Sequence, residues 1–115
     1  LLSRAGRTVL ATLSARAGSI GFNALGGLTS YRTAKAAVNQ VIHTTAIALA
    51  RTHKAAICVA LHPGTVATPF TEKYLGRRPS VSPAEAAQNL LGVIDGLPPD
   101  HTGQFFDWKG EAVPW

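Results

Sequence analysis

The sequence predicts an α/β protein built around a doubly wound parallel sheet. Two short apolar runs, 8–13 and 54–61, end at loops rich in glycine, serine or proline, which is typical of strands buried on both faces. An alanine-rich segment, 31–52, lies between them and carries Val38 and Ile42 at near-helical spacing. Because a strand, a helix and a second buried strand follow one another, we expect a parallel crossover.

Turn and capping residues mark the remaining elements. The segments expected there are a turn at 63–65, a short helix or lid at 68–76, a mobile connector at 77–81 and a last strand at 104–108. Thr29 or Ser30 is predicted to cap the long helix. A further helix is expected to begin at Ser82, with Pro83 in its first turn and Glu85 as the capping-box partner.

The composition argues against several classes of protein. With 115 residues, 46% of them hydrophobic and 15% charged, the chain is expected to form one small domain. The net charge of +5 comes from scattered basic residues, so we expect no nucleic-acid partner. No apolar stretch approaches a membrane span, and the start lacks the order of a signal peptide. We therefore expect no membrane partner and a cytoplasmic location.

The cysteine and the histidines favour structural roles. Cys58 is the only cysteine and lies inside an apolar run, so a buried core position is expected. His62 precedes the Pro-Gly turn and is expected to be a strand-end residue rather than a base. The four histidines show no ligand spacing with one another or with carboxylates, so no metal site is predicted.

Tyr31 and Lys35 form the main candidate for chemistry. If the segment is helical, residues four apart lie on one face, so the phenol and the ammonium are neighbours. A nearby cation favours the phenolate, which would let a tyrosine exchange a proton with a carbonyl or alcohol oxygen near neutral pH. The alternative is an ordinary solvated helix face.

The predicted topology also places a crevice. In a parallel sheet, ligands bind outside the carboxyl ends of the strands. The loops after Leu13 and Leu61 should therefore open on the same edge as the start of the Tyr31 helix. This convergence makes the pairing of Tyr31 with Lys35 more than a local pattern.

Taken in order, these motifs resemble the classical short-chain dehydrogenase/reductase family, and most closely its branch of C-factor and sniffer-type carbonyl reductases. The segments that carry the resemblance are 13–20, Gly26-Gly27, 30–39, 62–69 and 103–108. The resemblance implies a Rossmann-like sheet, of which residues 1–115 form the carboxyl-terminal, catalytic and substrate half. The family's glycine-rich turn, Gly-x-x-x-Gly-x-Gly, is absent, so the dinucleotide-binding half is expected to be missing.

The resemblance implies an NAD(P)-dependent oxidoreductase that moves a hydride between a nicotinamide cofactor and a small carbonyl or alcohol substrate. Tyr31 would be the general acid or base, and Lys35 would bind the nicotinamide ribose. The residues Pro63, Gly64, Val66 and Thr68 would hold the nicotinamide end of the cofactor. The nearest branch implies NADP, with NAD as the alternative.

The catalytic serine is less well defined by the motif. In the family's usual Ser-Ser-x-x-Gly pattern the second serine is catalytic, and here the residue three before Gly18 is Ala15. Ser14 is the nearest hydroxyl and is the predicted catalytic serine, with Ser19 as the alternative. A shift of one residue at a strand end reverses the side-chain direction.

Other expectations concern the partners of the chain. Residues 69–81 are expected to cover the substrate, and Phe70, Tyr74 and Leu75 suggest an apolar carbonyl compound. The small side chains of the long helix also allow a homodimer. The competing function is an inactive fragment or pseudo-enzyme that acts only as an interaction module, because half a sheet exposes an apolar edge.

Overall fold

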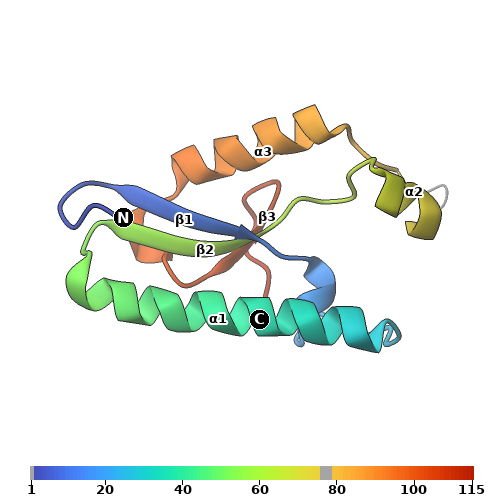
Figure 1. Ribbon diagram of the computed structural model, residues 1–115, viewed down its shortest axis with the longest axis horizontal. Coiled ribbons are helices and arrows are strands. Elements are labelled where there is room, and N and C mark those ends of the chain that lie inside the picture. Colours follow the sequence, from blue (N-terminus) through green and yellow to red (C-terminus); the bar gives the residue numbers. More distant parts are fainter. Residues whose placement is uncertain (1, 76–78) are drawn as a thin grey trace.

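The computed structural model describes residues 2–75 and 79–115 and confirms the α/β parallel architecture (Figure 1). The described strands form one parallel sheet in the order β1-β2-β3, namely β1 (Thr8–Leu13), β2 (Ala56–His62) and β3 (Phe105–Asp107). The helices are α1 (Thr29–Thr52), α2 (Pro69–Leu75) and α3 (Pro83–Gly96), with short 3-10 turns η1 (Arg16–Gly18) and η2 (Pro99–His101). Helices α1 and α3 cover opposite faces of the sheet.

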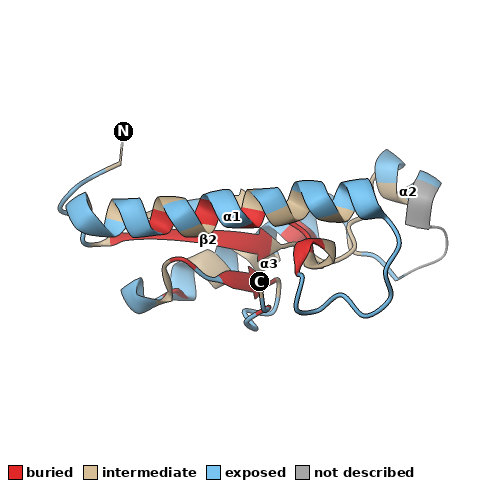
Figure 2. Cartoon of the chain, turned by 90° about the horizontal axis from the view of Figure 1, so that it is seen from below, coloured by how far each residue is buried: buried red, intermediate tan, exposed pale blue. Residues whose placement is uncertain are grey.

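Strand β2 is the centre of the core. All its residues from Ala56 to Leu61 are buried, as Figure 2 shows. Cys58 packs with Ile42 of α1 on one face, and Ile57 packs with residues of α3 on the other. The prediction that Cys58 is a core residue is confirmed, and burial raises the pKa of its thiol.

Strand β1 differs from its prediction. Val9 and Ala11 pack into the cluster on the α3 side, but Leu10 and Leu13 are 38% and 58% exposed. The expectation of burial on both faces is wrong for β1 in this chain. The physical reason is its place at the edge of the described sheet, where β2 is its only strand neighbour.

The start of α1 also differs from its prediction. The helix begins at Thr29, and its capping position is Leu28, which has a φ of 51° and makes no side-chain cap. Thr29 and Ser30 lie inside the first turn, so neither is the cap. Arg32 instead reaches back from the helix and donates from Nε to the Gly27 carbonyl at 2.8 Å. A guanidinium thus ties the preceding loop to the helix.

The start of α3 follows the sequence closely. The Glu85 amide donates to Ser82 Oγ at 3.1 Å, which confirms Ser82 as the cap, and Pro83 is the first helical residue. Residues 77 and 78 of the expected connector lie outside the described residues. Val81, at its end, forms a bridge to Val66. Within the described part of the chain, no helix is long and apolar enough to cross a membrane.

We predict that Gly18→Ala lowers the free energy of unfolding. A Cβ at this position would lie 2.7 Å from Lys35 Cβ, so η1 and α1 would have to separate, at a cost of about 1–3 kcal/mol. Gly92→Ala, inside α3, is the matched control, since its Cβ would meet no atom within 4 Å. That control should stabilise the protein by about 0.5–1 kcal/mol. Urea unfolding of both variants tests this, and equal effects would contradict it.

Candidate active site

The strands of the sheet point toward the end of the molecule at which α1 begins (Figure 1). The Arg16 amide donates to Nδ1 of His62 at 3.2 Å, which joins the loop after β1 to the end of β2. Gly18 lies against the backbone of Lys35, which joins the same loop to α1. The predicted convergence of the two loops with the helix is therefore confirmed.

Tyr31 and Lys35 are neighbours, as their spacing predicts. Lys35 Nζ lies 5.9 Å from the centre of the Tyr31 ring, and the tyrosine is 39% exposed. Within the described residues, the Tyr31 hydroxyl has no hydrogen-bonding partner and the Lys35 ammonium has no carboxylate partner. Both polar groups are therefore available to a bound molecule.

Ser14 is turned into the protein. Its side chain is 4% exposed, and Oγ donates to Asn39 Oδ1 on α1 at 2.6 Å. Asn39 in turn donates to the Gly18 carbonyl at 3.4 Å. The hydroxyl proton of Ser14 thus ties the end of β1 to α1, and Asn39 ties α1 to η1. The catalytic role of Ser14 stays a prediction, and it requires this hydroxyl to leave Asn39.

Ser19, the alternative serine, is also internal. It is 1% exposed, donates to the Pro114 carbonyl and accepts a hydrogen bond from the Phe22 amide at 3.0 Å. These bonds anchor the loop before α1 to the end of the chain. Ala15 holds the position three before Gly18 and brings no hydroxyl.

The Pro63-Gly64 turn is held against an indole ring. Gly64 has a φ of +79°, and a Cβ added to it would lie 2.9 Å from both Cδ1 and Nε1 of Trp108. Glycine is required at this position for two reasons, the left-handed backbone and the close approach of the ring.

The segment after this turn presents a free amide. Thr71 Oγ1 donates to the Val66 carbonyl at 2.5 Å, and the Thr71 amide donates to Thr68 Oγ1 at 3.2 Å. Within the described residues, no protein group accepts a hydrogen bond from the Val66 amide. The turn therefore offers a backbone donor at the carboxyl edge of the sheet.

Of the residues expected to cover the substrate, Phe70 lies on α2 and is 59% exposed. Figure 1 places α2 at the same end of the molecule as the start of α1. The side chains of Tyr74 and Leu75 lie outside the described residues. In the described ranges, no three of the histidine, cysteine and acidic residues gather as a metal-binding group.

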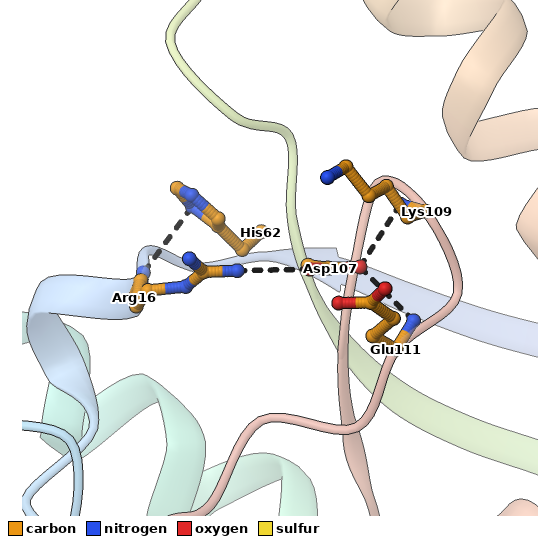
Figure 3. A network of polar contacts seen from close by, with 5 residues as sticks. All are labelled: Arg16, His62, Asp107, Lys109 and Glu111. Carbon is orange, nitrogen blue, oxygen red and sulfur yellow. Dashed lines mark hydrogen bonds and ion pairs between the residues drawn. The ribbon is translucent and has the colours of Figure 1, made fainter.

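An ion pair that sequence reasoning missed crosses this edge (Figure 3). Arg16 Nη2 lies 2.8 Å from Asp107 Oδ2. Asp107 is 2% exposed, and its Oδ1 accepts hydrogen bonds from the amides of Lys109 at 2.9 Å and Glu111 at 3.0 Å. The two charged partners are far apart in the sequence, and no local motif relates them.

His62 is a neutral residue in this network, and its position confirms it as the last residue of β2. The pKa of His62 is lowered to about 4, mainly by burial and also by the nearby Arg16 charge, while Asp107 opposes the shift. Nδ1 accepts the hydrogen bond from the Arg16 amide, so the ring proton of the neutral form lies on Nε2.

Comparisons with known proteins agree with this geometry, although no family model matches the chain. The chain is 37% identical over 107 residues to C-signal of Myxococcus xanthus, covering 92% of this chain and 60% of that protein. It is 36% identical over 103 residues to 1-hydroxy-2-glutathionyl-2-methyl-3-butene dehydrogenase of Rhodococcus sp. (strain AD45), covering 90% and 45%. The chain thus spans about half the length of these relatives.

Solved structures give the same result. Carbonyl reductase Sniffer of Drosophila melanogaster superposes with a TM-score of 0.83 at 28% identity, covering 96% of this chain and 42% of that one. An NADPH-bound carbonyl reductase from chicken fatty liver gives 0.78 at 30% identity, covering 93% and 42%. A Burkholderia multivorans protein with bound NADP, assigned to the short-chain dehydrogenases/reductases, gives 0.73 at 27% identity, covering 93% and 44%.

The fold and the site define an α/β protein with a Rossmann-like parallel sheet and a Tyr-x-x-x-Lys helix at its carboxyl edge. Together with these relatives, they support a member of the short-chain dehydrogenase/reductase family, of which this chain spans part of the length.

We predict that His62 makes the protein less stable as the pH falls. Its folded pKa of about 4 lies below the ordinary value of 6.5, so the unfolded chain binds a proton first. Stability should therefore decline between about pH 7 and pH 4 and change little from this source below that range. His62→Asn keeps an acceptor near Nδ1 but cannot titrate, so it should reduce this decline in urea unfolding. An unchanged pH dependence would contradict the assignment.

Proposed function

We propose that this chain is the catalytic and substrate half of an NADP-dependent oxidoreductase that interconverts carbonyl compounds and alcohols. The observation that carries the proposal is the pairing of Tyr31 and Lys35 at the carboxyl edge of the sheet, with no protein partner for either polar group in the described residues. Lone polar groups of this kind at a parallel sheet's ligand edge favour binding and proton transfer over a structural role.

In this proposal each polar group has one task. When bound, NADPH supplies the hydride. The Tyr31 hydroxyl donates a proton to the carbonyl oxygen during reduction and takes it back during oxidation. The Lys35 ammonium, beside the ring, would stabilise the tyrosinate and would donate hydrogen bonds to the ribose of the cofactor.

The turn after β2 suits the nicotinamide end of the cofactor. The Val66 amide, which lacks a protein acceptor in the described residues, can donate to a carboxamide oxygen. Thr68 lies two residues further on, and Pro63 and Gly64 set the path of the backbone. NADP is favoured because the chicken carbonyl reductase and the Burkholderia protein are described with NADPH and NADP bound. NAD is the alternative.

The exposed edge of β1 supports the proposal that residues 1–115 form a partial domain. Leu10 and Leu13 are exposed, and β2 is the only described strand that pairs with β1. A dinucleotide-binding half that added a strand here would cover these side chains and satisfy the free edge. The exposed Val41 and Ile47 of α1 support a homodimer through this helix.

A second candidate function is a pseudo-enzyme that acts only as an interaction module. It is favoured by the position of the hydroxyls, since Ala15 replaces the family's serine and Ser14 is bonded to Asn39. A carbonyl oxygen at this site would then have one hydrogen-bond donor, the Tyr31 hydroxyl, instead of two. Turnover of a carbonyl substrate separates the two functions.

We predict that Tyr31→Phe lowers turnover by about 100-fold or more, because a general acid contributes rate factors of this size. The measurement is NADPH oxidation with a series of carbonyl compounds, made on a protein that carries this chain together with a dinucleotide-binding half. NADPH affinity and the melting temperature should stay close to those of the unchanged protein, which shows that the site is intact. Retained turnover would remove Tyr31 from the acid-base role.

We also predict that Lys35→Met weakens NADPH binding about 10-fold or more, since a charge-assisted hydrogen bond to the ribose is lost. Lys54→Met is the matched control. Lys54 is exposed, whereas Lys35 is half-buried, and the Lys54 ammonium donates to the Ala50 carbonyl at the far end of α1. Fluorescence titration with NADPH and NADH measures both variants. Equal affinities would exclude Lys35 from the cofactor site, and no binding by the unchanged protein would favour the interaction module.

A further inference from the structure

The end of β3 contacts both parts of the proposed site. Asp107 is the last residue of the strand and Trp108 follows it. The Asp107 carboxylate is held by two backbone amides of its own turn and by Arg16 (Figure 3). The Trp108 ring lies against Gly64. The strand end and the first residue of the following turn thus contact two different neighbours.

The contact with Arg16 leads to the catalytic pair. Arg16 begins η1, and the Ala17 carbonyl in that turn accepts a hydrogen bond from Arg32 Nη1 of α1 at 3.3 Å. Gly18, at the end of the turn, lies so close to Lys35 that a methyl group would not fit between them. A shift of η1 would therefore press on or release the backbone of α1 at Lys35.

The contact with Gly64 leads to the cofactor turn. The Trp108 indole fills the space that a side chain at position 64 would need. Lys109 Nζ lies 5.2 Å from the centre of the same ring and favours its orientation through a cation-π contact. Because Val66 follows two residues after Gly64, a shift of the ring would move the free amide.

We propose that Asp107 and Trp108 are positioning residues that set the spacing between the Tyr31-Lys35 pair and the nicotinamide turn. The proposal rests on the proposed function and adds two residues to its site. Neither side chain touches the reacting atoms. Asp107 acts through Arg16 and η1, and Trp108 acts through Gly64. Hydride and proton transfer need reacting atoms within about 3–3.5 Å, so a misplacement of about 1 Å can cost about 100-fold.

The two residues should affect different kinetic constants. Asp107→Asn keeps the acceptor for both turn amides but replaces Oδ2 with an amino group facing Arg16, so kcat should fall about 10-fold with little change in KM for NADPH. Trp108→Leu should raise KM for NADPH about 10-fold with a smaller effect on kcat. Glu111→Gln is the control, because Glu111 reaches Asp107 only through its backbone.

Arg16→Met provides a second way to break the ion pair while the Asp107 turn keeps its own hydrogen bonds. It should lower kcat as much as Asp107→Asn, and the double variant should be no worse than either single change. Arg16→Lys should restore part of the loss, because it keeps the charge beside the carboxylate. Additive losses, or a loss in Arg16→Lys equal to that in Arg16→Met, would overturn the coupling.

Amide hydrogen exchange gives a readout that does not depend on activity. In Asp107→Asn, exchange should speed up at Gly18 and Ser19, whose amides bond within η1. In Trp108→Leu it should speed up at Ala67 and Val81, whose amides hold the bridge next to the nicotinamide turn.

The combined results separate the two proposals. Absence of turnover in the unchanged protein would overturn the proposed function and the positioning roles together. If the unchanged protein turns over substrate, two results would overturn only the positioning roles. One is that Asp107→Asn and Trp108→Leu change kcat and KM for NADPH by equal factors. The other is that amide exchange speeds up uniformly along the chain.

Discussion

The burial of β2 on both faces is the constraint on which the rest of the structure depends. Its apolar side chains face α1 on one side and the residues of α3 on the other, and its backbone pairs with β1 and β3. A strand buried in this way cannot slip, because a shift of one residue would exchange the two faces. The ends of all three strands are therefore held in register at one edge, where His62, Arg16 and Asp107 meet.

Two glycines then place the site on this framework, because they let neighbouring elements approach each other closely. Gly18 lets η1 touch the backbone of α1 at Lys35, and Gly64 lets the turn after β2 touch Trp108. These contacts are short because no Cβ intervenes, and short contacts between rigid elements transmit small displacements. The hydrogen bond from Ser14 to Asn39 reinforces the first of them. The geometry around Tyr31 is thus set by backbone packing and by polar contacts outside the pair.

Two cations at this edge have opposite roles. Arg16 is neutralised by the buried carboxylate of Asp107, whereas Lys35 has no carboxylate partner in the described residues. His62, between the strand ends, stays neutral because burial and the nearby Arg16 oppose a second positive charge. Among the described residues, Lys35 therefore presents a positive charge next to the phenol that no carboxylate neutralises, which suits an anionic oxygen or a cofactor hydroxyl.

The sequence by itself determined the local features of this protein. The apolar run of β2, the helix carrying Tyr31 and Lys35 on one face, and the cap at Ser82 all follow from neighbours within a few residues. Only the tertiary structure decided the direction of Ser14, and it also paired Arg16 with Asp107, 91 residues away. The direction of Ser14 and the Arg16–Asp107 pair depend on which surfaces the folded sheet brings together. The spacing of residues along the sequence does not indicate those contacts. Local hydrogen bonding and side-chain periodicity can be predicted from neighbouring residues, whereas the packing between distant segments is determined only when the chain folds.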